Sequence, residues 1–381
     1  MSSTDRPHDI VVFGATGFTG QLVVRHLAHA APAGVRWAIA GRSLDKLAQV
    51  AKDAGVDVPM LRVDVSDPAS LRSMAQSTRV VLTTVGPYAE YGEPLVRACV
   101  EAGTDYVDIT GEPDFVEEMQ ARYHNAAAEK GLRIVSCCGF DSIPHDLGAF
   151  FTVQRFSEPV PILCRGFVRA AGQASGGTWH SAIEAFSNAR RDAARRSKRA
   201  RPSRPTGRRV RADKLRIFHE ASIGAWAVPL PTIDPVIVRR SAAAMSAFGP
   251  DFTYGHYVRV NELPLALAGV AGVGALAVLA QLPPAKALLL KARSRGDGPS
   301  EQERAQSWFN VRFIAEGGGK RVVTEVAGGD PGYDETSKMV AESALCLVLD
   351  RDRLPPHVGV ITPAMAMGNA LIERLRAQGI T

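Results

Sequence analysis

The sequence predicts an α/β protein in which a doubly wound parallel sheet is followed by a second, α+β domain. Three observations lead to this. Short apolar runs alternate with amphipathic stretches over the first 140 residues, a glycine-rich turn follows the first run, and the second half changes to longer strand-like runs. Strands that alternate with helices of roughly 10–15 residues are typical of βαβ units and a parallel sheet.

The first domain is predicted to span residues 1–140. Asp67 and Asp114 stand where helix N-caps are expected, and Gly103 and Gly131 stand where helices should end. The predicted strands are 10–13, 37–40, 61–64, 80–85, 106–109 and 132–135, and the predicted helices are 21–29, 44–52, 67–77, 92–102 and 114–130.

The second domain is predicted to span residues 141–362, and a final helix within 363–381 is expected to pack back on the first domain. Ser142 with Pro144 indicates a helix start. The further predictions are strands at 163–170 and 254–260, helices at 178–190, 334–349 and 363–377, and a hairpin of 308–314 with 321–326 turned by Gly317, Gly318 and Gly319.

The formal charge of +6 is local and does not describe the whole chain. Residues 190–216 contain 13 of the 45 basic residues and two of the 39 acidic ones, so the remainder is net −5. This segment holds no aromatic residue, which argues against stacking on single-stranded nucleic acid. With Pro202, Pro205 and Gly207 it is predicted to be a basic loop, either without a partner or suited to anionic headgroups or an acidic carrier protein.

The five cysteines form no disulfide framework and no pair has zinc-ligand spacing, so no metal site is predicted. The first nine residues are polar and lack the apolar run of a secretion signal. We therefore expect a cytoplasmic protein, with an association with the inner face of the membrane as a further expectation discussed below.

The turn after the first predicted strand has the pattern G-x-x-G-x-x-G and opens a helix. A dinucleotide pyrophosphate needs backbone N–H groups at a helix N-terminus with no side chain in the way, and glycines provide this. The pattern therefore predicts a Rossmann-type cofactor site. Its predicted cofactor-binding residues are Gly14, Thr16, Gly17, Phe18, Thr19 and Gly20.

NADP is predicted over NAD at the end of the second strand. A carboxylate at this place would hold the 2′-hydroxyl of NAD, whereas a cation accommodates the 2′-phosphate of NADP. The sequence supplies Arg42, Ser43 and Lys46, although Arg42 is also compatible with an ordinary surface residue. Asp64 is predicted near the adenine ring, and Gly86 with Pro87 is predicted beside the nicotinamide.

Several longer stretches resemble the saccharopine dehydrogenase-like oxidoreductases, and within them the bacterial trans-acting enoyl reductases most. The resemblance spans nearly the whole chain. Its motifs are FGATGFTG (13–20), AGRSLDKL (40–47), VGPYAEYGEPLVRACVEAGTDYVDITGE (85–112), GFDSIPHDLG (139–148), GGTWHSA (176–182), DPGYDETSKMVAESALCL (330–347) and GVITPAMAMG (359–368).

This resemblance implies an NADPH-dependent reduction of an α,β-double bond in acyl chains made by a polyketide synthase that lacks its own reductase. It implies a role in lipid biosynthesis and an acyl thioester substrate carried on an acyl carrier domain. The proposed catalytic candidates are Tyr88, Asp141, Ser142 and His145, with His180 as a further polar group.

Each catalytic candidate has a structural alternative. Asp141 and Ser142 are also suited to capping a helix, His145 to the surface, and Tyr88 to a wall of the nicotinamide site. Water is an alternative proton source. Tyr88 is the first of the candidates.

Residues 263–285 carry no charge and satisfy the length test for a membrane span. A single crossing would separate the C-terminal motifs from the NADP domain, which disfavours it. The remaining interpretations are a peripheral or re-entrant membrane contact and a buried helix that lines an acyl groove or a homodimer interface.

Two other functions stay open. One is C–N oxidoreduction of an amino acid, as in saccharopine dehydrogenases, which requires paired cations for carboxylates. The other is a membrane- or lipid-associated protein that holds NADP without turnover.

Overall fold

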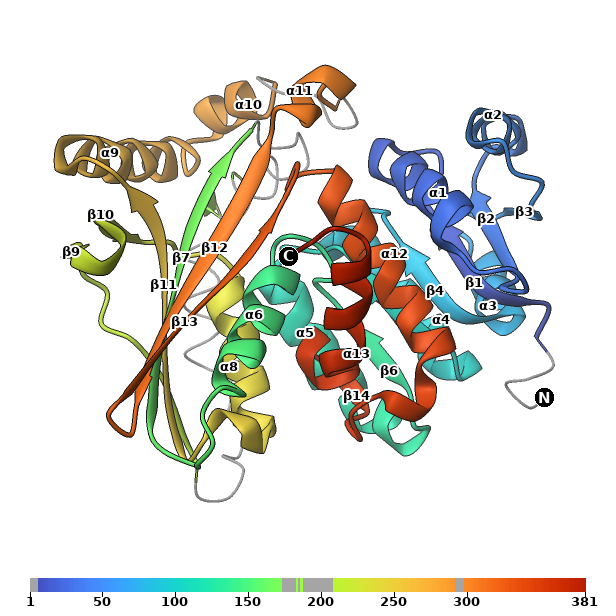
Figure 1. Ribbon diagram of the computed structural model, residues 1–381. Helices are drawn as coiled ribbons and strands as arrows, with labels where there is room; N and C mark the ends of the chain where they lie inside the picture. The colour runs from blue at the N-terminus through green and yellow to red at the C-terminus, as the bar shows by residue number, and fades with distance from the viewer. Residues whose placement is uncertain (1–5, 173–182, 184–185, 188–207, 292–297) are drawn as a thin grey trace. The chain divides into compact units, whose positions relative to one another are not determined.

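The computed structural model describes residues 6–172, 183, 186–187, 208–291 and 298–381, which form two compact units (Figure 1). The first unit comprises Met1–Ile143 and Gly329–Thr381, and the second comprises Pro144–Gly328. The chain therefore returns to the first unit at Gly329, earlier than the predicted 363. The reason is that helix α12 (Asp334–Leu349) packs on α1 and on strands β1, β4 and β5.

The first unit is built on a seven-stranded parallel sheet of order β14-β6-β5-β4-β1-β2-β3, which confirms the doubly wound prediction. Six strands were expected, and the seventh, β14, comes from the C-terminal part of the chain. The strands are β1 (His8–Phe13), β2 (Trp37–Gly41), β3 (Met60–Arg62), β4 (Thr78–Thr83), β5 (Asp105–Asp108), β6 (Arg133–Val135) and β14 (Gly359–Ile361).

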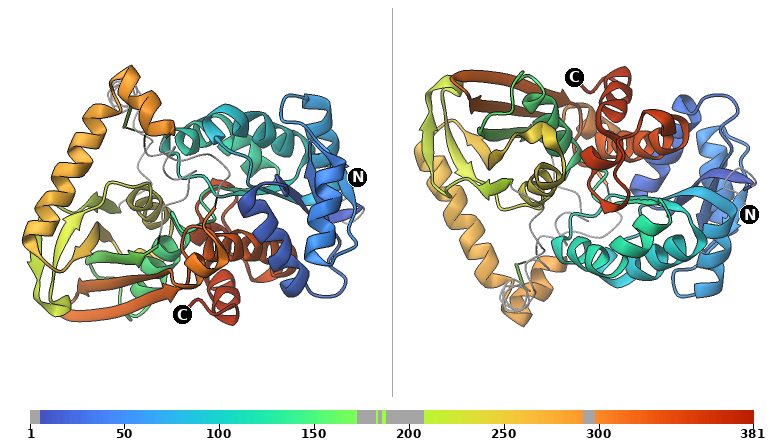
Figure 2. Two further views of the ribbon diagram at one scale, coloured as in Figure 1. Left: turned by 90° about the horizontal axis from the view of Figure 1, so that it is seen from above. Right: turned by 90° about the horizontal axis from the view of Figure 1, so that it is seen from below.

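Helices cover both faces of this sheet (Figure 2). Helices α1, α12 and α13 pack together on one face, and α3, α4 and α5 on the other. Besides α12, the helices are α1 (Phe18–Ala30), α2 (Leu44–Ala54), α3 (Pro68–Ser77), α4 (Tyr88–Ala102), α5 (Pro113–Glu129) and α13 (Pro363–Ala377), with a short 3₁₀ turn η4 (Arg351–Arg353).

The helix-end predictions hold with one exception. Asp67 caps α3 by accepting a hydrogen bond from the Ala69 N–H, and Gly103 ends α4 in the left-handed conformation. Asp114, by contrast, lies inside the first turn of α5, because the helix begins at Pro113, directly after the N-cap Glu112.

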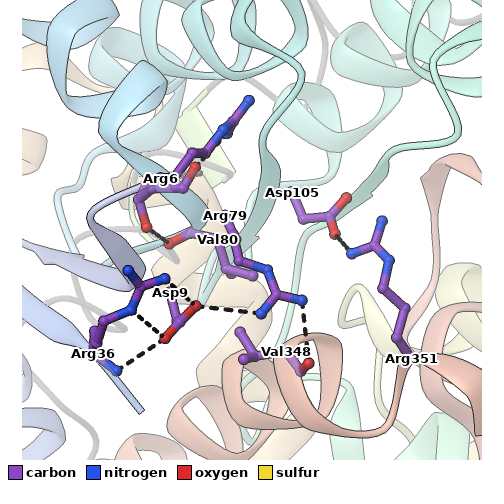
Figure 3. A network of polar contacts seen from close by, with 9 residues as sticks. Arg6, Asp9, Arg36, Arg79, Val80, Asp105, Val348 and Arg351 are labelled. Atoms are coloured by element: carbon purple, nitrogen blue, oxygen red, sulfur yellow. Dashed lines mark hydrogen bonds and ion pairs between the residues drawn. The ribbon is translucent and has the colours of Figure 1, made fainter. Parts of the chain in front are cut away.

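Ion pairs hold the amino ends of the parallel strands (Figure 3). Asp9 on β1 accepts hydrogen bonds from Arg36 and from Arg79 on β4, and Arg79 also donates to the carbonyl of Val348 at the end of α12. Asp105 on β5 pairs with Arg351 at 2.7 Å. This network holds the C-terminal end of α12 at the amino ends of the strands, which are opposite their carboxyl ends.

The second unit contains a mixed sheet of order β13-β12-β7-β11-β10-β9, with β8 paired to β11. The predicted hairpin is present as β12 and β13, which turn at Gly318 and Gly319. The strands are β7 (Ile162–Ala171), β8 (Arg209–Ala212), β9 (Phe218–Glu220), β10 (Ala225–Pro229), β11 (Asp251–Val260), β12 (Trp308–Gly317) and β13 (Lys320–Gly328).

Helix α6 packs closely on one face of this sheet. At Gly148 of this helix there is no room for a side chain, since a Cβ would lie 2.3 Å from the Phe313 ring. Phe167 and Tyr257 stack on the opposite face within a small apolar cluster. The helices are α6 (Ile143–Val153), α8 (Asp234–Ala244), α9 (Leu263–Leu279), α10 (Pro283–Lys291) and α11 (Glu301–Ala305), with 3₁₀ turns η2 (Ala221–Ile223) and η3 (Ser246–Phe248).

The predicted apolar helix 263–285 is wrong as a single helix. It is divided into α9 and α10, which meet at 115° because Pro283 and Pro284 start a new helix (Figure 2). Among the described residues no single helix is long and apolar enough to cross a membrane, and this bent pair passes that test only when its two helices are taken together.

Helix α9 is also not buried in the chain. The helix contacts β10 and β11, and Ala266 is 2% exposed, whereas Leu265 is 63% exposed and Val273 50% exposed. Of the interpretations offered for this segment, burial in a groove of the same chain is therefore excluded for α9.

Most of the predicted basic loop 190–216 lies outside the described residues, as do His180 and most of the predicted helix 178–190. In its described part, Arg209–Ala212 is strand β8 and not a loop, because it pairs in parallel with Asp251–Tyr254 of β11.

Candidate functional site

The glycine-rich turn links β1 to α1 and leaves no room for side chains. Gly14 has φ +92°, and a Cβ on it would lie 2.8 Å from the side chains of Thr84 and Val85. A Cβ on Gly20 would lie 2.1 Å from the carbonyl oxygen of Gly14. Glycine is therefore required at both positions, and the turn presents bare backbone at the carboxyl end of β1.

The N-terminus of α1 is suited to phosphate. Within this described stretch its N-cap, Gly17, provides no side-chain hydrogen bond, and the first turn contains no acidic residue. The partial positive charge of such a helix end favours an anion. Thr16, Phe18 and Thr19 of the turn are half-buried around this end.

Helix α4 provides the contrast. The Glu112 carboxylate accepts hydrogen bonds from the N–H groups of Tyr88 and Ala89, at 3.0 and 2.8 Å. The N-terminus of α4 is thus already neutralised by a residue of the same unit, whereas the first turn of α1 contains no acidic residue.

The end of β2 carries the predicted cations. Arg42 and Lys46 are exposed, while Ser43 caps α2 by accepting a hydrogen bond from the Lys46 N–H. The parallel register pairs Gly41 with Arg62 at the end of β3, so a third cation stands beside Arg42. Arg62 was not predicted from the sequence. The second and third strands of such sheets are usually neighbours, and this could have indicated it.

Asp64 follows β3 on the same side. It accepts hydrogen bonds from the Ser66 N–H and hydroxyl, and these hold the pKa of Asp64 below its usual value, with smaller contributions from Arg42 and Arg62. Asp64 is therefore ionised at the edge where an adenosine is predicted.

Tyr88, the first catalytic candidate, is 6% exposed. Its hydroxyl donates to the carbonyl of Thr83 at 3.2 Å and accepts from the Ile109 N–H at 3.4 Å. Burial and the nearby Asp108 carboxylate raise the pKa of Tyr88 well above its usual value. This geometry favours a structural role in which Tyr88 supports the loop next to Gly86 and Pro87, and its place as a wall of the nicotinamide site stays a prediction.

Asp108 at the end of β5 was not predicted from the sequence. Its carboxylate is fully buried and accepts hydrogen bonds from the Tyr106 and Ser136 hydroxyls and from the N–H groups of Thr110 and Cys137. Burial nevertheless raises the pKa of Asp108 to about 6. An aspartate in a strand-like run gives no sequence signal of such a network.

Asp108 also accepts a hydrogen bond from a residue with an unusual backbone conformation, Cys137. Cys137 has φ +65°, the left-handed region that non-glycine residues rarely adopt, and its N–H donates to Asp108. Such strain is concentrated at functional sites. The Asp108 carboxylate thus shapes the loop that leads to Asp141.

Asp141 and Ser142 follow this loop. Ser142 is buried, and its hydroxyl donates to the Asp141 carbonyl oxygen. The Asp141 carboxyl lies against Gly111, since a Cβ there would be 2.7 Å from Oδ2. Burial raises the pKa of Asp141. The Asp141 carboxyl therefore releases its proton less readily than an exposed aspartate does.

His145 belongs to the second unit and is buried, which excludes the surface alternative. The Nε2 atoms of His145 and His256 each lie 3.5 Å from an oxygen of Asp234. Burial lowers the pKa of both imidazoles, that of His256 to about 3. No metal site was predicted, yet these three side chains are of the types that bind divalent metals and lie within 4.8 Å of one another.

The segment before α12 returns to the cofactor turn. The Tyr333 ring contacts Phe18 edge-on, with centroids 4.7 Å apart. Thr336 accepts a hydrogen bond from the Phe140 N–H at 3.1 Å. The motif at 330–347 thereby connects the glycine-rich turn to the loop of Asp141 and Ser142, a proximity that sequence separation conceals.

Residues 10–135 match the family of the saccharopine dehydrogenase NADP binding domain. A solved structure of saccharopine dehydrogenase (L-Glu forming) from Saccharomyces cerevisiae is 14% identical, with a TM-score of 0.57 and 98% coverage of both chains. At that identity the likeness confirms the fold alone.

Curated relatives match the whole chain. A Mycobacterium tuberculosis protein is 37% identical over 417 aligned positions, covering 100% of this chain and 98% of its own, and its name proposes a trans-acting enoyl reductase. Proteins named trans-acting enoyl reductase from Mycobacterium ulcerans and Mycobacterium bovis are 36% and 35% identical with the same coverage. The chain therefore belongs to the saccharopine dehydrogenase-like family of NADP-dependent oxidoreductases, together with these enoyl reductases.

Proposed function

We propose that this protein is an NADPH-dependent enoyl reductase that acts in trans on acyl thioesters carried by a separate synthase. The observation that supports this most is the full-length similarity to relatives with that name, with coverage of 98% of their chains. A role in lipid or polyketide acyl-chain synthesis follows from the proposal.

The residues of the first unit fit the cofactor. The cradle of Gly14, Gly17 and Gly20 and the uncapped start of α1 would hold the pyrophosphate, and Thr16, Phe18 and Thr19 would line it. Arg42, Lys46 and Arg62 would face the 2′-phosphate, with Ser43 and Asp64 at the adenosine end. Gly86 and Pro87 would border the nicotinamide, which when bound supplies a hydride.

We infer that Asp141 supplies the proton. Reduction of the enoyl bond adds a hydride to the β-carbon and a proton to the α-carbon, which leaves the saturated thioester. Asp141 offers a carboxyl with a raised pKa next to Gly111, whereas the Tyr88 hydroxyl is hydrogen-bonded into the sheet. A general acid at this step contributes about 100-fold or more to the rate.

The pH profile tests this role. Asp141→Asn should lower turnover about 100-fold and abolish the decline of rate at high pH that deprotonation of Asp141 causes. Tyr88→Phe is the comparison variant, because it removes the Tyr88 hydroxyl and leaves the aromatic ring at the start of α4 in place. Unchanged turnover and an unchanged profile in Asp141→Asn would assign the proton to water or to another group.

The reaction itself is tested by NADPH oxidation with crotonyl-CoA and longer enoyl thioesters, and with saccharopine and NADP as the comparison. Turnover of the enoyl thioesters supports the proposal. Turnover restricted to saccharopine contradicts it, and tight NADPH binding without turnover of any substrate would support a binding protein instead.

We further infer that α9 and α10 contact a membrane surface at its interface, which is the environment of a lipidic product. Lys286 and Lys291 accompany the apolar side chains, a combination suited to an anionic bilayer. Eight leucines and valines of this region are exposed: Leu265, Leu267, Val270, Val273, Val278, Leu279, Leu282 and Leu288.

Flotation with phosphatidylcholine and phosphatidylglycerol vesicles tests this contact. The protein should float with the vesicles, and Leu265→Glu with Val273→Glu should remove it from the lipid fraction. If the protein does not float and the same variant instead dissociates a dimer, the apolar surface is an interface between two copies.

A further inference from the structure

The second unit contains a cavity of about 350 Å³ on one face of its sheet. Three arginines line it, each from a different one of the neighbouring strands β11, β7 and β12. They are Arg259, Arg169 and Arg312, and the cavity also contains Trp308 and Glu325.

The strand register explains why the three arginine side chains lie on the same face of the sheet. Asn310 is opposite Arg169, and Arg312 is two residues further along β12, so its side chain lies on the same face. Val258 is paired with Val168, and the residues that follow them, Arg259 and Arg169, share one face of the adjacent parallel strands.

Positive charge exceeds negative charge in this cavity. Among its lining residues Glu325 supplies the one carboxylate, and that carboxylate is paired with Arg312 at 2.8 and 3.0 Å. The Arg259 Nε atom is buried and has no hydrogen-bond partner in the described part of the chain. Burial and the two neighbouring arginines lower the pKa of Arg259, so an anion would relieve an unfavourable charge arrangement.

The shape of the site favours a compact anion with several oxygens. Guanidinium groups bind phosphate oxygens through paired hydrogen bonds, which Arg169 and Arg259 can offer. Arg312 donates to Glu325 through Nε and Nη2 and adds its remaining N–H groups and positive charge. Arg169 lies over the Trp308 ring with its Cζ 5.3 Å from the centroid, which keeps one wall flat and apolar. An amino acid with distant carboxylates would instead need separate cationic sites.

We propose that the cavity of Arg169, Arg259 and Arg312 binds the phosphate group of a phosphopantetheine arm, and so holds the acyl thioester by the part that all its carriers share. This inference rests on the proposed enoyl reductase function for the identity of the ligand. The charge and the position of the site are independent of it. Helix α9 begins shortly after Arg259, which places its exposed apolar residues next in the chain to the phosphate site.

Binding is tested without turnover, by calorimetric titration of the full chain with 4′-phosphopantetheine and with pantetheine in phosphate-free buffer. Phosphopantetheine should bind at least about tenfold more tightly, because charge-assisted hydrogen bonds form only with the phosphate. Arg169→Gln and Arg259→Gln should each remove this difference and leave pantetheine binding unchanged. Arg321→Gln is the matched control, since Arg321 is on the same sheet outside the cavity and pairs with Glu220.

Equal binding of the two compounds by the wild-type protein would overturn the proposal, as would an equal loss in Arg321→Gln. Arg169 is exposed, so its variant should fold even if Arg259→Gln does not. Because these titrations need no enoyl substrate, a selective phosphopantetheine site would stand even if the reductase function failed.

Turnover distinguishes the two carriers. The KM for crotonyl-CoA and the KM for crotonyl holo-carrier protein should both rise about tenfold in Arg169→Gln, with kcat retained, because both contain the same phosphate. A rise confined to crotonyl-CoA would overturn the assignment and place the adenosine phosphates in the cavity. An unchanged KM for both, in an enzyme that reduces both, would refute the site and leave the reductase function intact.

Discussion

Gly14 and Gly34 have similar left-handed φ angles, +92° and +99°, but different surroundings. A Cβ at Gly34 meets no atom within 4 Å, whereas one at Gly14 meets Thr84 and Val85 in the cofactor turn. Gly34→Ala should cost about 1 kcal/mol of folding stability and retain NADPH affinity. Gly14→Ala should in addition weaken NADPH binding more than about tenfold, measured by fluorescence titration below both melting temperatures. Equal NADPH affinities of the Gly14→Ala and Gly34→Ala variants would argue against this turn as the pyrophosphate site.

We propose that Arg42, together with Arg62 and Lys46, selects NADPH over NADH. Arg42→Ala should weaken NADPH binding about tenfold and leave NADH binding unchanged, because only NADPH carries the 2′-phosphate. Lys52→Ala, an exposed cation at the far end of α2, is the control. A parallel loss of both cofactors would show that Arg42 acts through the fold and not through the phosphate.

Asp108 gives a pH dependence of stability with a defined sign. Its pKa is about 6 in the folded protein, above the value of about 3.9 expected in the unfolded chain. The folded state therefore binds the proton more tightly, and the stability from this group is present below about pH 4 and is lost as the pH rises through 6.

The unfolding free energy of the wild type should contain a contribution from Asp108 that falls by roughly 2 kcal/mol between pH 4 and 6.5, and Asp108→Asn should remove this contribution. Urea unfolding at several pH values measures both proteins. Other groups titrate in the same range, so the comparison is between the two slopes. The assignment fails if wild type and variant lose stability with pH in parallel.

At the scale of elements, α9 allows a matched pair of substitutions. Ala266 is buried and Val273 is half-exposed, although both belong to one uncharged helix. Val273→Asp should change the unfolding free energy by less than about 0.5 kcal/mol, whereas Ala266→Asp should cost about 2 kcal/mol or more. Thermal unfolding measures both, and a large loss in Val273→Asp would mean that the outer face of α9 is covered in the folded protein.

Elements with strong local signals were predictable from the sequence. The bounds of α12 and α13 agree with the predicted 334–349 and 363–377, and the alternation of strands and helices gave the parallel sheet. Strand β14 was not predictable in the same way, because three residues carry little periodicity and its partner β6 is more than 200 residues away. The break between α9 and α10 was concealed by uninterrupted apolarity, despite Pro283 and Pro284.

The residues of the candidate site likewise fall into those with a local sequence signal and those brought together only by the fold. The glycine-rich turn and Arg42 are local patterns whose chemistry can be read directly from neighbouring residues. Asp108, the contact of Tyr333 with Phe18, and the arginine cavity depend on which strands become neighbours. Pairing of distant segments is set by the whole fold, so no local pattern indicates these residues.

At the scale of the whole molecule, a cofactor unit and a second unit with an anionic-ligand cavity contribute to one proposed reaction. In this proposal the first unit binds NADPH, and the second recognises the phosphopantetheine arm of the acyl carrier. This division predicts that Arg169→Gln affects the KM for the thioester and leaves the KM for NADPH unchanged.

The central claim, enoyl reduction, is tested most directly by following the hydride. Crotonyl-CoA is incubated with the protein and each epimer of 4-deuterated NADPH, and the product is analysed by mass spectrometry and NMR. The account predicts butyryl-CoA with one deuterium at the β-carbon from one epimer and none from the other. Absence of the saturated product, or deuterium at the α-carbon, would contradict it.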